Sequence, residues 1–168
     1  DIMNLVSEHI DLAIRAGALA DSGLYARHLF DVRLKLFATP EYLAAMPAIM
    51  EPAQLLDCNL LTLKTIHTLS FQRAGIAHKI PIKTQTGNVQ ANEMNTLIAF
   101  CIAGTGVALL PDVSVRSYVA QGQLVEVLPG CIFDAVPIHA LTPEKNPPAR
   151  VRRLIEHLKE QQDAAYFI

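Results

Sequence analysis

The stretch NTLIAFCIAGTGVALLPD, residues 95–112, places a helical pattern directly before a strand pattern. Its first half has apolar residues at 97, 98, 101 and 102, which is the spacing of one helix face. The run VALLP after it is short, apolar and closed by a proline, as is typical of a buried strand. We therefore expect a helix over 93–103, a turn on two glycines and a buried strand over 107–111.

The order of these elements decides what the glycines do. A phosphate-binding loop follows a strand and opens a helix, so that the helix amides face the anion. Here the helix comes first, so Gly104-Thr105-Gly106 does not fit such a loop. We interpret Gly104 as a helix terminator with positive φ and Gly106 as a point of close backbone approach. The lining of a pocket is the alternative for this turn.

Short strands alternate with short helices on both sides of this stretch. The predicted strands are 10–17, 24–39 with a break near Phe30, 78–85, 107–111, 123–129 and 135–143, and residues 59–71 form a β-rich segment. The predicted helices are 1–9, 41–46, 52–57, 93–103, one ending at Gly122 and one opened by Pro147-Pro148. This alternation predicts an α/β fold with a mainly parallel sheet and helices on its faces. The segments 24–39 and 123–142 are long enough to pass between two lobes.

Composition excludes several classes of protein. The chain has 168 residues, 51% of them hydrophobic, and a net charge of −2, so it can bury a core but has no basic excess to hold nucleic acid by itself. Cys58, Cys101 and Cys131 are an odd number without C-x-x-C spacing, which argues against a disulfide framework or a zinc knuckle. We expect Cys101 to be a small buried hydrophobe. We see neither a membrane span nor a signal peptide, so a reducing cytoplasm is the default.

The chain lacks the residue patterns of common catalytic sites. Ser22 lies in ADSG, which lacks the first glycine of a nucleophile elbow, and no histidine pair has metal-ligand spacing. We therefore predict no enzyme activity, no metal and no cofactor.

Three positions suit a bound anion or polar molecule. Arg15 ends a predicted strand, where a guanidinium could meet a ligand carboxylate, although an ion pair within the protein is equally plausible. His139 alternates with apolar residues in VPIHAL and could face a crevice, although a surface role is the simpler interpretation. Asn92 is a suitable N-cap for the helix over 93–103, and Glu93 complements its dipole but would repel an anion.

Several segments, in order along nearly the whole chain, resemble the effector-binding domain of the LysR-type transcriptional regulators. IDLAIRAGALADSGLYARHL resembles that family's G-x-D-L-A-I-R strand, its turn and the next strand, and LKLFATPEYL its crossover segment. EPAQLLDCNLL is similar to the next segment, with Gln54 and Asp57 in place of the usual Asp and His. VQANEMNTLIAFCIAGTGVALLPD, QGQLVEVLPG and VPIHALTPEKNPPARVRRLIEHL resemble the remaining blocks.

The chain also departs from the family pattern. It has no tryptophan near Leu69-Ser70. The family's DNA-binding winged helix, its linker helix and the first elements of its effector domain have no counterpart here. We expect the chain to be a fragment.

The resemblance implies two Rossmann-like lobes joined by two crossover strands, as in type II periplasmic binding proteins. Residues 1–39 and 136–168 would form the first lobe and residues 40–135 the second, with hinges near Thr39 and Pro137-Ile138. A small-molecule effector would bind between the lobes. The expected effector contacts are Arg15, Gly17, Thr39, Asn92, Glu93, Thr105 and His139.

The resemblance also implies a function and partners. The domain would relay effector binding, through a homodimer or homotetramer, to DNA-binding heads that contact DNA by a winged helix-turn-helix absent from this chain. We expect a cytoplasmic protein without membrane contact. A solute-binding protein of a transport system is the alternative, and an enzyme ranks third.

Overall fold

The computed structural model describes residues 9–19, 23–82 and 88–160. Apart from His9, the predicted helix over 1–9 lies outside these ranges. The described residues divide into two compact units: unit 1 comprises residues 9–32 and 135–160, and unit 2 comprises Arg33–Asp134. Among the described residues, no helix combines the length and hydropathy needed to cross a membrane.

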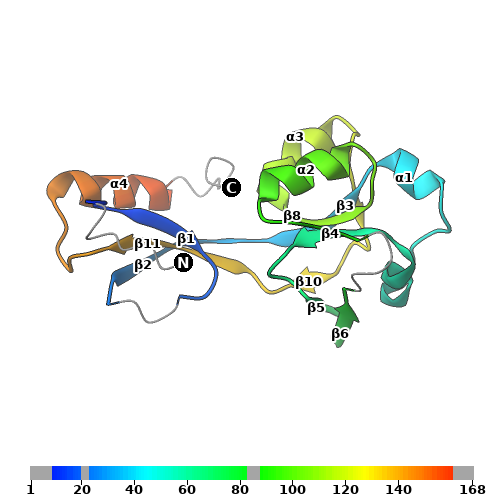
Figure 1. Ribbon diagram of the computed structural model, residues 1–168, viewed down its shortest axis with the longest axis horizontal. Coiled ribbons are helices and arrows are strands. Elements are labelled where there is room, and N and C mark those ends of the chain that lie inside the picture. Colours follow the sequence, from blue (N-terminus) through cyan, green and yellow to red (C-terminus); the bar gives the residue numbers. More distant parts are fainter. Residues whose placement is uncertain (1–8, 20–22, 83–87, 161–168) are drawn as a thin grey trace. The chain divides into compact units, whose positions relative to one another are not determined.

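Unit 1 is an antiparallel sheet with a helix packed on it (Figure 1). The strand order is β1 (Ala13–Ala16), β11 (Val136–Thr142), β2 (Tyr25–Val32). Helix α4 (Ala149–Glu160) buries its apolar stripe of Val151, Ile155 and Leu158. The prediction of a mainly parallel sheet is wrong for this unit. The chain leaves it along β2 and returns along β11, so these two strands run in opposite directions.

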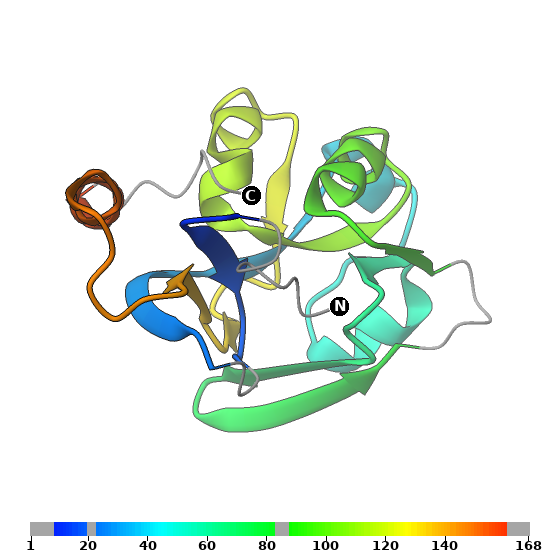
Figure 2. The same ribbon diagram turned by 60° about the vertical axis from the view of Figure 1, so that its left-hand side comes forward.

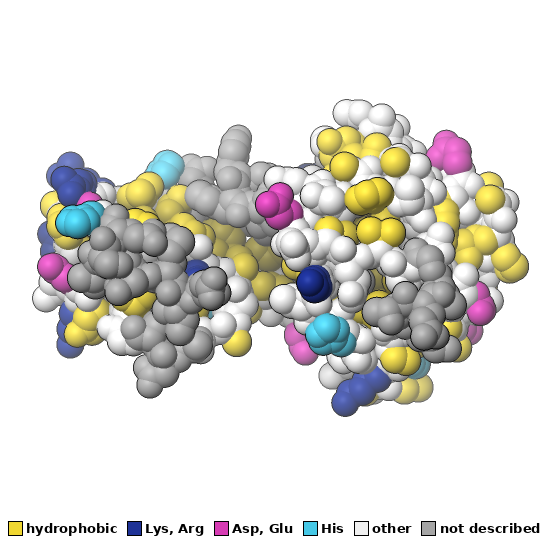
Figure 3. Space-filling view, in the orientation of Figure 1, with side chains coloured by type: hydrophobic (Ala, Val, Ile, Leu, Met, Phe, Trp, Pro, Cys, Tyr) yellow, Lys and Arg dark blue, Asp and Glu magenta, His cyan; other side chains and the backbone are white. Residues whose placement is uncertain are grey.

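Unit 2 is built on a mixed five-stranded sheet. The order is β7 (Val89–Ala91), β4 (Leu60–Leu63), β8 (Val107–Pro111), β3 (Leu34–Ala38), β9 (Val125–Val127). Only the pairings of β4 with β7 and β8 are parallel. Helices α2 (Met94–Ile102) and α3 (Asp112–Ala120) lie on one face of this sheet (Figure 1). Hydrophobic side chains also show on the outer surface over these helices (Figure 3), where Phe100 of α2 is 41% exposed.

Strand β8 explains why the run VALLP is entirely apolar. Ala108 and Leu110 pack beneath α2 and α3, together with Leu97 and Cys101 of α2. Val107 and Leu109 point to the opposite face, where a second core holds Leu36, Leu55 and Phe71. A strand covered on both faces has no position for a polar side chain. The predicted buried strand over 107–111 is confirmed.

A smaller sheet and two short helices cover the other face of unit 2. The small sheet has the order β10 (Ile132–Phe133), β5 (Thr68–Arg73), β6 (Ile76–Pro81), and β5 and β6 form the green hairpin at the bottom of Figure 2. The helices are α1 (Pro40–Ala44) and the 3-10 helix η1 (Pro52–Asp57). The segment 59–71 is β-rich as expected, and it contains strands of two different sheets, β4 and β5.

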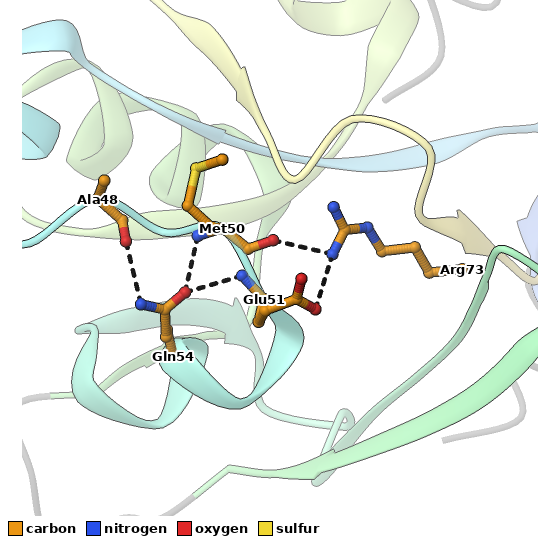
Figure 4. A network of polar contacts seen from close by, with 5 residues as sticks. All are labelled: Ala48, Met50, Glu51, Gln54 and Arg73. Carbon is orange, nitrogen blue, oxygen red and sulfur yellow. Dashed lines mark hydrogen bonds and ion pairs between the residues drawn. The ribbon is translucent and has the colours of Figure 1, made fainter.

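A polar network fixes η1 against β5 (Figure 4). Gln54 Oε1 accepts hydrogen bonds from the N–H groups of Met50 and Glu51, at 2.7 and 2.8 Å, while its Nε2 donates to Ala48 O. Arg73 Nη1 donates to Met50 O and lies 3.2 Å from Glu51 Oε2. Gln54, one of the departures from the family pattern, therefore caps the start of η1.

The two glycines before β8 have the separate roles predicted for them. Gly104 has φ +71° at the end of α2, a conformation that costs glycine little. A Cβ on Gly106 would lie 2.3 Å from Asn59 O, the atom that accepts the hydrogen bond from Val107 N–H. Gly106 thus allows β8 to enter the sheet beside β4.

The unit boundaries differ from those expected. The chain passes from unit 1 to unit 2 between Val32 and Arg33 and returns between Asp134 and Ala135, whereas we expected these boundaries after Thr39 and after Ala135. The earlier first boundary follows from hydrogen bonding: β3, residues 34–38, pairs with β8 and β9 of unit 2.

Candidate functional site

Three polar side chains form one row across the sheet of unit 1. Arg15 on β1 pairs with His139 on β11, and His139 pairs with His28 on β2. Directly opposed residues of neighbouring strands project from the same face of a sheet, so the three side chains share one face. A register shift between Ile138 and His139 sets this alignment. The row joins two predicted site residues, Arg15 and His139, and adds His28.

The histidines of this row are in contact with each other. The ring centroids of His28 and His139 are 5.7 Å apart with an interplanar angle of 75°. His28 Nε2 lies 2.8 Å from Asp31 Oδ1, which fixes the ring orientation of His28. His139 Nδ1 is buried and has no hydrogen-bond partner in the described part of the chain. Buried polar atoms without partners are rare, so Nδ1 is a candidate contact for a ligand atom.

Gly17 closes β1 rather than offering a free amide. Its φ is +89°, and a Cβ there would meet no atom within 4 Å, so the backbone conformation and not the available space favours glycine. Its N–H donates to Pro137 O at 2.9 Å. A ligand contact from this amide would have to replace that hydrogen bond.

In unit 2, Asn92 and Glu93 lie where β7 passes into α2. Glu93, and not Asn92 as predicted, is the N-cap residue, and its side chain forms no cap hydrogen bond. The difference arises because α2 begins at Met94, one residue later than expected. The first helical amide with an intrahelical acceptor is Leu97 N–H, which donates to Glu93 O. The preceding first-turn amides can therefore serve a bound acceptor.

Strand directions separate these residues from Thr39 and Thr105. Since β3 is antiparallel to β8 and β4 is parallel to it, the end of β3 and the starts of β4 and β8 share one edge of the sheet. The end of β7 lies at the opposite edge, about 10 Å away along the strands. Asn92 and Glu93 thus occupy one edge and Thr39 and Thr105 the other.

Both threonines have structural partners. Thr39 is buried, and its Oγ1 accepts a hydrogen bond from Tyr42 N–H at the start of α1. Thr105 Oγ1 donates to Phe100 O at 2.9 Å, and Thr105 O accepts from Asn59 Nδ2. These contacts brace the turn between α2 and β8. Both hydroxyls thus already have partners within unit 2, and an effector contact from Thr39 or Thr105 stays a prediction.

The comparison with known families decides what kind of domain this is. A model of the LysR substrate binding domain matches residues 1–163. The chain belongs to this family. The predicted family and the two-lobed, periplasmic-binding-protein-like α/β fold are confirmed.

Relatives of this LysR substrate-binding domain are transcriptional regulators. The HTH-type regulator PtxR of Pseudomonas aeruginosa is 37% identical over 161 residues, covering 94% of this chain and 51% of the relative. The regulatory domain of CrgA from Neisseria meningitidis superimposes with a TM-score of 0.80 at 29% identity, covering 96% of this chain and 80% of that one. The full-length virulence activator AphB of Vibrio cholerae gives 0.76 at 28% identity, covering 91% and 52%. The chain spans about half the length of the curated relatives it matches, and these relatives give no support to the transport alternative.

The cysteines of this LysR domain are core residues, as predicted for Cys101. All three are free and buried. Burial raises the pKa of Cys58 to about 11 and that of Cys101 to about 12. Because the thiolate is the reactive form, neither thiol suits nucleophilic chemistry at neutral pH.

Sequence reasoning missed two residues beside the candidate contacts. His28 enters the row through the register of β2 with β11, which no local pattern reveals. Lys64 is exposed, and its N–H donates to Ala91 O, which places it at the same sheet edge as Asn92. The cationic residue directly after the strand LLTL was the available signal for Lys64.

Proposed function

We propose that this chain is the effector-sensing part of a LysR-type transcriptional regulator and that its effector is a small carboxylated metabolite. The observation that carries the proposal is the row of Arg15, His139 and His28 in a LysR substrate-binding domain. The described residues supply a guanidinium, an unpartnered buried imidazole nitrogen and an oriented second imidazole on one face.

Each group of the row suits a carboxylate. A guanidinium can hold both carboxylate oxygens in a bidentate, charge-assisted pair, which is stronger and more directional than an ammonium contact. His139 Nδ1 can donate when its tautomer or protonation state places a hydrogen there. In the proposal Arg15 and His139 contact the effector, Gly17 keeps Arg15 at the end of β1, and Asp31 orients His28.

The start of α2 is the proposed contribution of unit 2. Its first-turn amides and the side chain of Asn92 offer hydrogen-bond donors, and the helix dipole favours negative charge there. Lys64 at the same edge adds a cation. Glu93 would oppose an anion, so we assign it to the helix dipole alone. Asn92 is therefore the residue of this group to test.

The proposed output rests on the relatives, which are about twice as long as this chain. An effector shifts a conformational equilibrium only as far as its affinities for the two states differ. In the complete regulator, we propose, that shift is relayed by a homodimer or homotetramer to winged helix-turn-helix heads on DNA. In this proposal the regulator acts on DNA in the cytoplasm.

Thermal unfolding with matched ligand pairs tests the proposal. A panel of small carboxylates is compared with the corresponding amides, for example benzoate with benzamide and succinate with succinamide. A binding acid raises the unfolding temperature according to its concentration relative to Kd, and its amide does not.

Arg15→Ala should weaken binding of the stabilising acid by about 10- to 100-fold, since a charged hydrogen bond is lost. Arg152→Ala, an equal charge change at an exposed position of α4, is the matched control and should bind as the parent does. If both variants keep the parental temperature shifts, Arg15 is not an effector contact.

A further inference from the structure

The outer face of the small β10-β5-β6 sheet carries a hollow that the proposed function does not use. Its volume is about 270 Å³, close to the lower end of the range for small-molecule pockets. The lining residues are Ser70, Phe71, Gln72, Ala77, His78, Lys79, Ile132 and Asp134. All of them belong to unit 2, and none belongs to the candidate effector site.

Strand register arranges this lining in two outer rows. Ile132, Gln72 and Ala77 are directly opposed across β10, β5 and β6. Ser70 is opposed to Lys79, and continuing the β10 register by one residue brings Asp134 opposite Ser70. Phe71 lies between these rows and turns its side chain inward, stacked on the His78 ring at a centroid distance of 5.4 Å. The outer surface of the hollow is therefore formed by the side chains of the two rows, most of them polar, while the Phe71 side chain anchors β5 to the core on the other face.

Opposite charges lie at the two ends of the row formed by Asp134, Ser70 and Lys79. With neighbouring strands about 4.8 Å apart, the Cα atoms of Asp134 and Lys79 are separated by about 10 Å across β5. Within the described ranges, neither side chain forms an ion pair or a hydrogen bond. Both are exposed. A carboxylate, a hydroxyl and an ammonium thus stand in line, each able to bind an external group.

The row formed by Ile132, Gln72 and Ala77 adds an amide side chain and an apolar contact. Gln72 can donate and accept at the centre of the hollow, and Ile132 is 69% exposed beside it. We propose that the hollow binds a small zwitterion of dipeptide size, with its ammonium at Asp134, its carboxylate at Lys79 and its peptide group over Ser70 and Gln72. An apolar first side chain covers Ile132.

Leucylglycine is the probe, followed by NMR on the 168-residue chain. Titration should shift the backbone amide signals of β5, β6 and β10 with one common Kd. N-acetylleucylglycinamide, which has the same shape and no charge, should bind at least tenfold more weakly. Lys79→Gln and Asp134→Asn should each weaken leucylglycine binding by about tenfold, since each removes one charge-assisted contact. Unshifted signals elsewhere in the spectrum report that the variants remain folded.

Lys159→Gln on α4 is the matched control for loss of a cation and should leave the leucylglycine Kd unchanged. Three results would each overturn the proposal. They are the absence of shifts around the hollow, equal binding of the uncharged analogue, and an unchanged Kd in both hollow variants.

Discussion

The sheet of unit 1 brings its predicted site residues together, whereas the five-stranded sheet of unit 2 keeps its predicted site residues apart. In unit 1, strand register places Arg15 and His139 on one row, although they come from distant parts of the chain. In unit 2, Asn92 and Thr105 lie much closer in sequence, yet they occupy opposite edges of the sheet. Proximity in sequence is therefore a poor guide to proximity in a site.

The difference comes from what decides position in each sheet. In an antiparallel pair, the residues directly opposed across the strands share a face, so register alone assembles a row. In a parallel βαβ unit, the helix returns the chain to the edge where the strand began. A residue at the start of α2 and a residue after its end thus lie at opposite ends of the strands, about one strand length apart.

Gly106→Ala should produce the largest effect of the changes considered for these two sheets. The added Cβ would lie 2.3 Å from Asn59 O, a backbone atom that cannot move without disturbing the pairing of β4 and β8. We expect a loss of about 3 kcal/mol in the free energy of unfolding, measured by urea denaturation. Gly122→Ala, where no atom lies within 4 Å, isolates the cost of a positive φ and should lose about 1 kcal/mol. If the two variants lost the same free energy of unfolding, the backbone at Asn59 would be able to move away from the added Cβ.

Thr39→Ala and Asn92→Ala should show that one edge of the unit 2 sheet supports stability and the other supports ligand binding. Thr39→Ala removes the cap of α1 and should cost about 1 kcal/mol of stability without changing the thermal shift by a binding carboxylate. Asn92→Ala should leave stability within about 0.5 kcal/mol of the parent and reduce that shift. The reverse pattern would support Thr39 as an effector contact and count against Asn92.

Asp31→Asn should have the smallest effect on stability. The side chains of His28 and Asp31 are 51% and 55% exposed, and ion pairs this open to solvent contribute less than about 1 kcal/mol. We expect urea denaturation to show a change below about 0.5 kcal/mol. A loss above about 1 kcal/mol would mean that this end of the row supports the fold rather than a ligand.

Local patterns predicted most elements of the fold but not how they pair. The helix over 93–103 and the strand over 107–111 follow from apolar spacing, and the structure places them at Met94–Ile102 and Val107–Pro111. The long segment 24–39 divides at Arg33 rather than near Phe30, because residues on either side join different sheets. No periodicity within the segment records that change of partner.

The candidate site shows the same limit. Arg15 and His139 were predicted from their strand positions, and the polar start of α2 from its residue types. The bulge that aligns His28 with His139, and the strand directions that separate Thr39 and Thr105 from Asn92, depend on pairings between segments far apart in sequence. Such pairings come from tertiary packing, which single-segment propensities do not contain.

The two crossings at Val32/Arg33 and Asp134/Ala135 make unit 2 one continuous segment set within unit 1. Val32 pairs with Val136, so β2 has no β11 to bond with until the whole of unit 2 has left the ribosome. Unit 2 is therefore able to fold during synthesis while the first sheet is still incomplete. During that interval β1 and β2 both lack β11, their partner in this sheet, so their unpaired backbone groups are open to mispairing with a neighbouring nascent chain.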